Sequence, residues 1–199
     1  RQVSTLTPGL TLNSAGGIDL NVTNLLSISS SAFLLGNDHN INLSGSWSNS
    51  GTFTPGASGT ITFTGSGTHN LTNTSGETFT NLTSNTTGTI AFEAATDLTV
   101  TGTMTMTSGN FDLNSRTLTL GSGSVSTLSH TNGIVYNGNF TRYFPSAAIS
   151  SSVAPKAGLF PVGSSSEYRP VEINSTVNPV TPGYLTAVHT DVAGVTDVS

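Results

Sequence analysis

Residues 97–121 read DLTVTGTMTMTSGNFDLNSRTLTLG, and this stretch decides the fold. Threonine occupies every second position from 99 to 107, and the positions between carry Val100, Gly102, Met104 and Met106. Because successive side chains of a strand point to opposite faces, one face of this segment is hydroxylic and the other apolar. The pattern predicts strand with a methionine-containing face toward the core and the threonines outside.

The composition of the whole chain favours strands and turns. Of 199 residues, 34% are apolar and only 8% are charged, with a net charge of −5. Threonine is β-branched and suits a pleated surface, while Asn and Gly suit tight turns. No long apolar stripe of helical period occurs, so we expect an all-β protein.

Nucleic-acid binding and membrane insertion are disfavoured by the same composition. Five basic residues in 199 argue against nucleic-acid binding. No apolar run approaches the length of a membrane helix, so we expect no membrane insertion by this segment. The chain begins at Arg1 and ends at VTDVS in mid-pattern, which we interpret as a processed or partial segment of a longer protein.

Alternating apolar patches recur along residues 1–135 with a period near nineteen. The markers, spaced 20, 19, 18 and 20 residues apart, are Leu43, Phe63, Leu82, Val100 and Leu120. A unit of this size cannot close a core alone, but stacked units can. The period predicts a right-handed parallel β-helix, a β-solenoid of about 19 residues per coil. A β-sandwich of short strands is the alternative.

Residues 136–199 differ in composition from the repeats. Most of the prolines and all four tyrosines lie there, and the period is lost. Terminal units of a solenoid are usually atypical because an open stack exposes a sheet edge. We expect a cap that leads into an incomplete β-sandwich-like module.

Two pairs of carboxylates are nineteen residues apart, namely Asp19 with Asp38 and Glu93 with Asp112. On adjacent coils such a pair would supply acid/base catalysis on a polysaccharide or hold calcium. The simpler interpretation is a chance match to the period.

The four histidines lack metal-ligand spacing and no G-x-S-x-G motif occurs, so no catalytic residue, metal site or cofactor other than calcium is predicted.

Three further features have both a binding and a structural interpretation. Tyr143, Tyr168 and Arg169 are candidates for a ligand or partner surface, or pack the cap onto the module. The threonine row is of the kind that ice-binding solenoids present, or simply keeps the strand soluble. The aromatic residues Trp47, Phe53, Phe63, Phe79, Phe92 and Phe111 would form a sugar-stacking platform or, more simply, core ladders.

The repeats resemble those of a known class of protein. LSGSWSNSGTFTPGASGTITFTGSGTHNLTNTSGETFTNLT and the opening stretch are similar to β-helix segments of very large secreted surface proteins of the Bacteroidetes group. GLFPVGSSSEYRPVEI is similar to a segment that follows such repeats. The resemblance implies an extracellular adhesin, gliding-motility protein or stalk, exported by type IX secretion.

These observations give three expectations for function. The first is a non-enzymatic structural or adhesive segment of a secreted cell-surface protein, a stiff solenoid stalk. Its partners would be extracellular polysaccharide or a surface, and the secretion or outer-membrane machinery during export. The second is a carbohydrate-binding or carbohydrate-active β-helix protein, and the third is an ice-binding solenoid.

Overall fold

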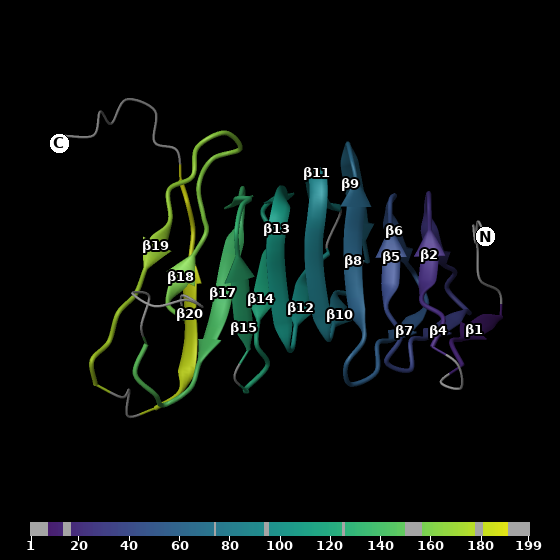
Figure 1. The fold of residues 1–199 in the computed structure, drawn as a ribbon, viewed down its shortest axis with the longest axis horizontal. Helices are drawn as coiled ribbons and strands as arrows, with labels where there is room; N and C mark the ends of the chain where they lie inside the picture. Colours follow the sequence, from purple (N-terminus) through teal and green to yellow (C-terminus); the bar gives the residue numbers. More distant parts are fainter. Residues whose placement is uncertain are drawn as a thin grey trace.

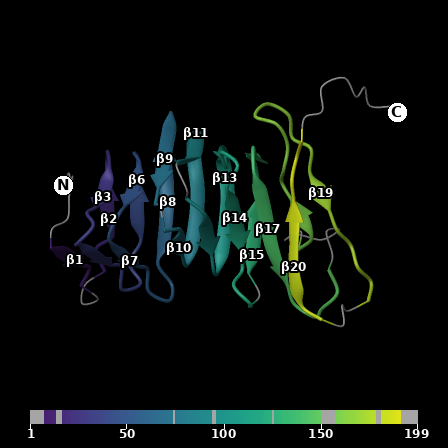
Figure 2. The same ribbon diagram turned by 180° about the vertical axis from the view of Figure 1, so that it is seen from behind.

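The computed structural model describes residues 8–13, 17–73, 75–93, 96–124, 126–149, 157–177 and 181–190. These residues form twenty β-strands and no helix. Most strands pair in parallel with a strand about one coil away, and the chain winds through about six turns stacked along the long axis of the molecule (Figures 1 and 2). The predicted parallel β-solenoid is confirmed, and the β-sandwich alternative is wrong.

Each coil contributes strands to three faces. The first face holds β2 (Leu20–Val22), β5 (Ile41–Leu43), β8 (Thr60–Gly65), the beginnings of β11 (Asn81–Glu93) and β13 (Thr103–Asp112), and β15 (Thr127–His130). The second holds β3 (Leu26–Ile28), β6 (Trp47–Asn49), β9 (Thr68–Thr72), the ends of β11 and β13, and β16 (Val135–Tyr136). The two faces join into one ten-stranded sheet because β11 and β13 run through both.

The third face is divided into two sheets. One contains β1 (Gly9–Thr11), β4 (Phe33–Leu35) and β7 (Thr52–Thr54). The other contains β10 (Glu77–Phe79), β12 (Leu98–Val100), β14 (Thr117–Leu120) and β17 (Asn139–Phe144), all parallel. The ladder is therefore interrupted between β7 and β10.

The coil is longer than the predicted nineteen residues. On the first face, successive members of one core ladder are 21, 20, 21, 22 and 24 residues apart: Leu20, Ile41, Ile61, Leu82, Met104 and Leu128. Over the solenoid as a whole, the coil has about 21 residues. Phe63 stacks on Leu43 as expected, but its next neighbour is Ser84 and not Leu82. The sequence markers mixed residues of the first and third faces, which shortened the apparent period.

The opening stretch bends between two faces. Val100 ends β12 on the third face, and Thr103 begins β13 on the first. A Cβ on Gly102 would lie 2.7 Å from Asn81 Oδ1 and 2.9 Å from the carbonyl oxygen of Thr80, so this corner has no room for a side chain. Met104 and Met106 are buried as predicted, but the threonine row is divided between two strands and does not lie along one.

The aromatic residues form the core. Trp47, Phe63, Phe79, Phe92 and Phe111 are each fully buried, and Phe53 packs against the same cluster. The rings of Trp47 and Phe79 meet edge to face with centroids 5.1 Å apart, a favoured geometry for aromatic pairs. The core-ladder interpretation is confirmed, and these rings are not available as a sugar platform.

Asparagine and aspartate side chains close the corners between coils. Backbone groups at a corner lie outside the regular ladder and need other partners. In five of the hydrogen bonds at these corners, a backbone N–H group donates to a side-chain amide or carboxylate oxygen one coil earlier: Asn40 to Asp19, Thr60 to Asn40, Thr103 to Asn81, Thr117 to Asp97 and Ile134 to Asn110, at 2.8–3.1 Å. This use accounts for Asn40, Asn81 and Asn110 at the corners.

The parallel stack continues past the boundary expected at residue 135. β17 pairs in parallel with β14 as far as Arg142. The pairing then becomes antiparallel, because β20 (Gly183–Ala187) runs against β17 and covers its free edge. β18 (Leu159–Phe160) and β19 (Val171–Glu172) form a separate antiparallel pair. The cap therefore begins after β17.

Phe63→Ala tests the core ladder on the first face. The ring is fully buried between Leu43 and Ser84 of the adjoining coils, so its removal leaves a cavity. We expect the free energy of unfolding to fall by about 3–5 kcal/mol, measured by urea denaturation. The neighbouring outward substitution Thr62→Ala should cost less than about 1 kcal/mol. Equal losses in the two variants would contradict the assigned faces.

Candidate functional site

The acid pair Glu93 and Asp112 is not stacked directly. Asp112 lies beside Ala91 in the register between β11 and β13, and Glu93 lies beside Thr72 of β9. An offset of nineteen displaces the two carboxylates by two positions, because the coil here has 21 residues. Asp112 Oδ1 instead accepts hydrogen bonds from Asn114 N at 3.0 Å and Asn137 Nδ2 at 2.8 Å.

The earlier pair, Asp19 and Asp38, has separate structural partners. Asp19 accepts from the backbone and side chain of Asn40. Asp38 has positive φ and accepts from the backbone N–H groups of Ala57 and Ser58. Within the described ranges, no group of three or more His, Cys, Asp or Glu side chains is placed to hold a metal ion.

Tyr143 lies apart from Tyr168 and Arg169, which are neighbours in the chain. Tyr143 is on β17 of the third face and packs against Tyr184 of β20, with centroids 5.2 Å apart. Tyr168 stacks on His130 of β15 on the first face, with centroids 5.4 Å apart and rings 7° from parallel. The two tyrosines therefore fasten separate segments of the cap to the last coil.

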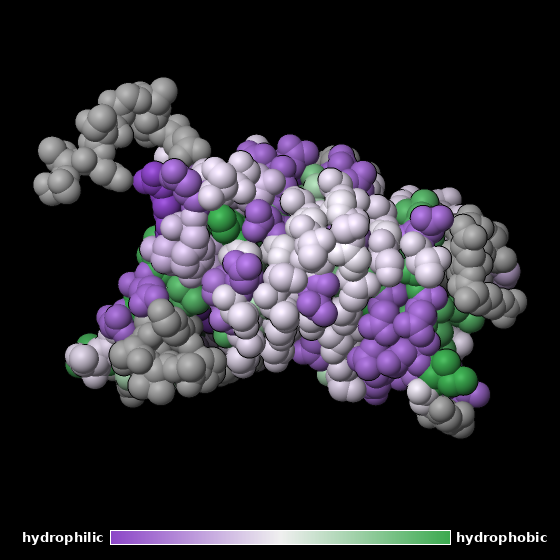
Figure 3. Space-filling model, turned by 45° about the horizontal axis from the view of Figure 1, so that its top comes forward, coloured by the Kyte–Doolittle hydropathy of each residue, from purple (hydrophilic) through white to green (hydrophobic). Residues whose placement is uncertain are grey.

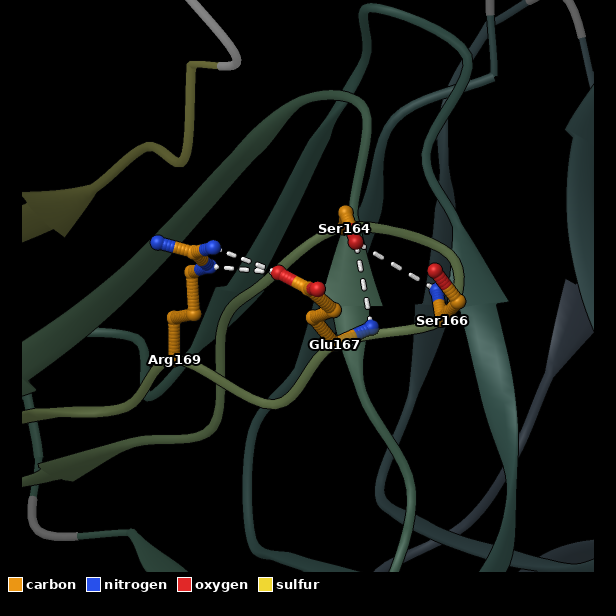
Figure 4. Close-up of polar contacts among 4 residues, drawn as sticks. All are labelled: Ser164, Ser166, Glu167 and Arg169. Carbon is orange, nitrogen blue, oxygen red and sulfur yellow. Dashed lines mark hydrogen bonds and ion pairs between the residues drawn. The ribbon is translucent and has the colours of Figure 1, made fainter. Parts of the chain in front are cut away.

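Arg169 forms an ion pair with Glu167 in a turn that also contains Ser164 (Figure 4). Its Nε lies 3.0 Å from Glu167 Oε2, and Ser164 Oγ accepts from the backbone N–H of Glu167. The hydrogen bond from Arg169 and then its charge lower the pKa of the Glu167 carboxyl. Both side chains of this ion pair are about half exposed, so the pair orders the turn and adds little stability.

Two charged residues occupy inward positions that the sequence pattern did not predict to be charged. Glu77 occupies the place that Leu98, Leu118 and Phe140 fill on later coils of the third face. Arg142 ends the neighbouring column after Phe79, Val100 and Leu120. Both are buried, with 6% and 3% of their surface exposed. An aligned repeat would have revealed each one as a charge in an apolar column.

Glu77 is fully satisfied by neutral donors. Its Oε2 accepts from Trp47 Nε1 at 2.8 Å, Asn49 Nδ2 at 2.9 Å and Asn73 Nδ2 at 3.1 Å, and Oε1 accepts from the N–H of Thr78. The residue lies at the start of β10, where the third-face ladder is interrupted. Its side chain thus connects β10 to β6 where the third face has no backbone ladder. A carboxylate enclosed in this way serves as a structural link.

Arg142 has fewer partners. Its Nη1 donates to the carbonyl oxygen of Leu159 at 2.5 Å, and its Nε is buried with no hydrogen-bond partner among the described residues. The guanidinium carbon lies 5.3 Å from the centroid of Phe144 and 5.7 Å from that of Phe160. Burial lowers the pKa of Arg142 to about 10. The surroundings therefore penalise the positive charge more than they stabilise it.

Hydroxyl and amide side chains cover the outside of the first face. One outward ladder runs along Asn42, Thr62, Thr83, Thr105 and Ser129. A second column lies two residues earlier on each strand, where Thr60 pairs with Asn81 and Thr103 with Thr127. The space-filling view shows broad areas of intermediate hydropathy over the central coils (Figure 3). This surface is polar and nearly uncharged.

Comparison with known proteins gives no relationship. The chain matches no family model, no curated protein and no solved structure. The described residues also contain no helix with the length and hydropathy needed to cross a membrane.

Glu77→Gln tests the buried carboxylate. The amide NH₂ would replace one acceptor oxygen with a donor and leave neighbouring N–H groups without a partner. We expect the free energy of unfolding to fall by about 1–3 kcal/mol, measured by urea denaturation. The matched control is Glu93→Gln, for which the change should stay within about 0.5 kcal/mol. If Glu77→Gln is as mild as its control, the described network contributes no stability.

Proposed function

We propose that this chain is a non-enzymatic structural or adhesive segment of a secreted cell-surface protein, in which it forms a stiff solenoid stalk. The observation that supports this most directly is the unbroken parallel pairing from β2 to β15 on the first face. Each coil is fixed to the next by backbone hydrogen bonds and by one shared core. Bending such a stack would separate strands along a whole side, so the stack resists bending.

The surface chemistry suits a segment that is exported and then exposed. Outward ladders of neutral hydroxyl and amide groups avoid the repulsion that a repeated charge would meet about 4.8 Å away. The same groups can exchange hydrogen bonds with neutral extracellular polysaccharide, which we propose as the adhesive partner. The resemblance to Bacteroidetes surface proteins supports export by type IX secretion and a role in adhesion or gliding motility.

One observation favours ice binding as a second candidate function. The first face repeats a hydroxyl or amide side chain in two columns over several coils, as described above. Neighbouring strands are about 4.8 Å apart and alternate residues about 6.6 Å apart, so the side chains form a regular two-dimensional array. The second face lacks this regularity, because Ala91, Asp112 and Tyr136 follow one another along a single outward ladder.

The stalk proposal predicts a rod-shaped, protease-resistant particle on the cell surface. We expect small-angle scattering of the full chain to give the pair-distance distribution of an elongated particle. We expect thermolysin to leave the β2–β17 region intact under native conditions. Antibody labelling of intact producing cells should detect the segment, and a panel of polysaccharides should show no turnover. Confinement of the protein to the cytoplasm, or hydrolysis of a polysaccharide, would contradict the proposal.

The ice-binding candidate makes a separate prediction. The full chain should inhibit ice recrystallisation, and Thr83→Tyr at the centre of the array should abolish the inhibition by breaking its flatness. Asn70→Tyr on the exposed second face is the matched control and should retain full activity. Absence of inhibition by the unmodified chain would eliminate this function and leave the stalk proposal unaffected.

A further inference from the structure

A cavity lies at the C-terminal end of the core, between the last strands of the first and third faces. Its volume is about 320 Å³. The residues that line it include Ser126, Leu128, Arg142, Phe144 and Ile149. The size falls at the lower end of the range for small-molecule sites, and such sites combine an apolar wall with a few polar groups.

The cavity wall contains two polar groups without a partner. Arg142 Nε and Ser126 Oγ are both buried and form no hydrogen bond with any described residue. Unsatisfied buried polar atoms are rare in proteins, and each one costs free energy or indicates a missing partner. Here the two belong to different strands or turns but line the same cavity, which points to a shared ligand.

The missing partner must also balance a charge. Arg142 forms no ion pair among the described residues, and the pKa of its guanidinium is lowered by burial alone. Glu77, the other buried charge of the third face, is three strands away and already accepts four hydrogen bonds. The contacts with Phe144 and Phe160 offset part of the desolvation but provide no acceptor.

We propose that this cavity binds a small organic monocarboxylate, with its carboxylate on Arg142 and Ser126 and its hydrocarbon or aromatic body against Leu128, Phe144 and Ile149. A carboxylate matches one guanidinium in charge and in the geometry of its donors. A phosphate dianion would bring an uncompensated charge into a largely apolar cavity. A neutral sugar would leave many hydroxyl groups facing apolar side chains.

The position of the site is consistent with this ligand. Arg142 ends a core column whose earlier members are apolar, so an apolar residue would complete the stack without any ligand. Replacing an unpaired buried charge by a hydrophobic residue of similar volume is often neutral or stabilising. An arginine at this place therefore suggests binding more than stability.

Calorimetric titration of the full chain with hexanoate and with phenylacetate tests the proposal. We expect saturable binding of at least one acid at millimolar concentration, together with a rise in the unfolding temperature. Hexanamide, which has the same body without the charge, should bind at least tenfold more weakly. Arg142→Met should reduce the affinity for the acid by at least about tenfold while the variant remains as stable as the unmodified chain.

Ser126→Ala provides a milder variant should Arg142→Met fail to fold, and it should weaken binding of the acid without affecting that of the amide. The matched control is Thr119→Ala on β14, since Thr119 does not line the cavity and its substitution leaves both partners of the carboxylate in place. Absence of saturable binding of both acids, or equal affinity for hexanoate and hexanamide, would overturn the proposal.

Discussion

The rest of the structure depends on backbone hydrogen bonding between strands one coil apart in parallel register. This pairing places chemically similar positions of successive coils on top of one another, so a choice of residue at one position is repeated along the stack. Apolar positions become core ladders such as Leu98, Leu118 and Phe140. Outward positions become ladders of hydroxyl groups such as Thr78, Thr99 and Thr119, where a repeated charge would be unfavourable. The low charge of the chain follows from the fold.

Departures from the register are where individual side chains matter most. The third-face ladder is interrupted before β10, and there Glu77 draws Trp47, Asn49 and Asn73 together. The stack ends at β17, and there Arg142 occupies a core position with an unmet donor beside a cavity. The carboxylate of Glu77 has hydrogen-bond donors on both oxygens, whereas Arg142 Nε has no acceptor among the described residues. This contrast separates a structural role from a binding role more clearly than the charges themselves do.

The sequence was sufficient to predict the class of fold because alternation and repetition are local signals. Met104 and Met106 alternate with threonines, and that alone specifies which side is buried. The coil length was misjudged because Leu82 and Val100 look alike in the sequence but lie on different faces. The acid pair Glu93 and Asp112 depended on that length, so the same error displaced it. Direct stacking requires the register, and the register depends on how many residues each corner uses.

The candidate site could not be predicted for a different reason. Tyr143 and Arg169 are residue types that are usually exposed, and they stand in a segment that differs from the repeats. Arg142 is instead an inward residue of β17, and the alternating stretch FTRYF gives no sign that it differs from its neighbours. Its significance depends on the absence of an acceptor for Nε, which is a property of the folded neighbourhood. The sequence shows that an arginine stands at position 142, but it does not show that the folded protein leaves its Nε without an acceptor.

Disulfide formation between introduced cysteines tests the register most directly, because the chain has no cysteine of its own. Thr62 and Thr83 are direct neighbours in the parallel pairing of β8 and β11, and neighbouring strands are about 4.8 Å apart, within reach of a disulfide. Asn81 is nineteen residues from Thr62 and would lie roughly 8 Å away, too far to be bridged. Under mild oxidation, mass spectrometry should find a disulfide in the Thr62→Cys/Thr83→Cys variant and free thiols in Thr62→Cys/Asn81→Cys. The reverse result would contradict the 21-residue coil on which the whole account depends.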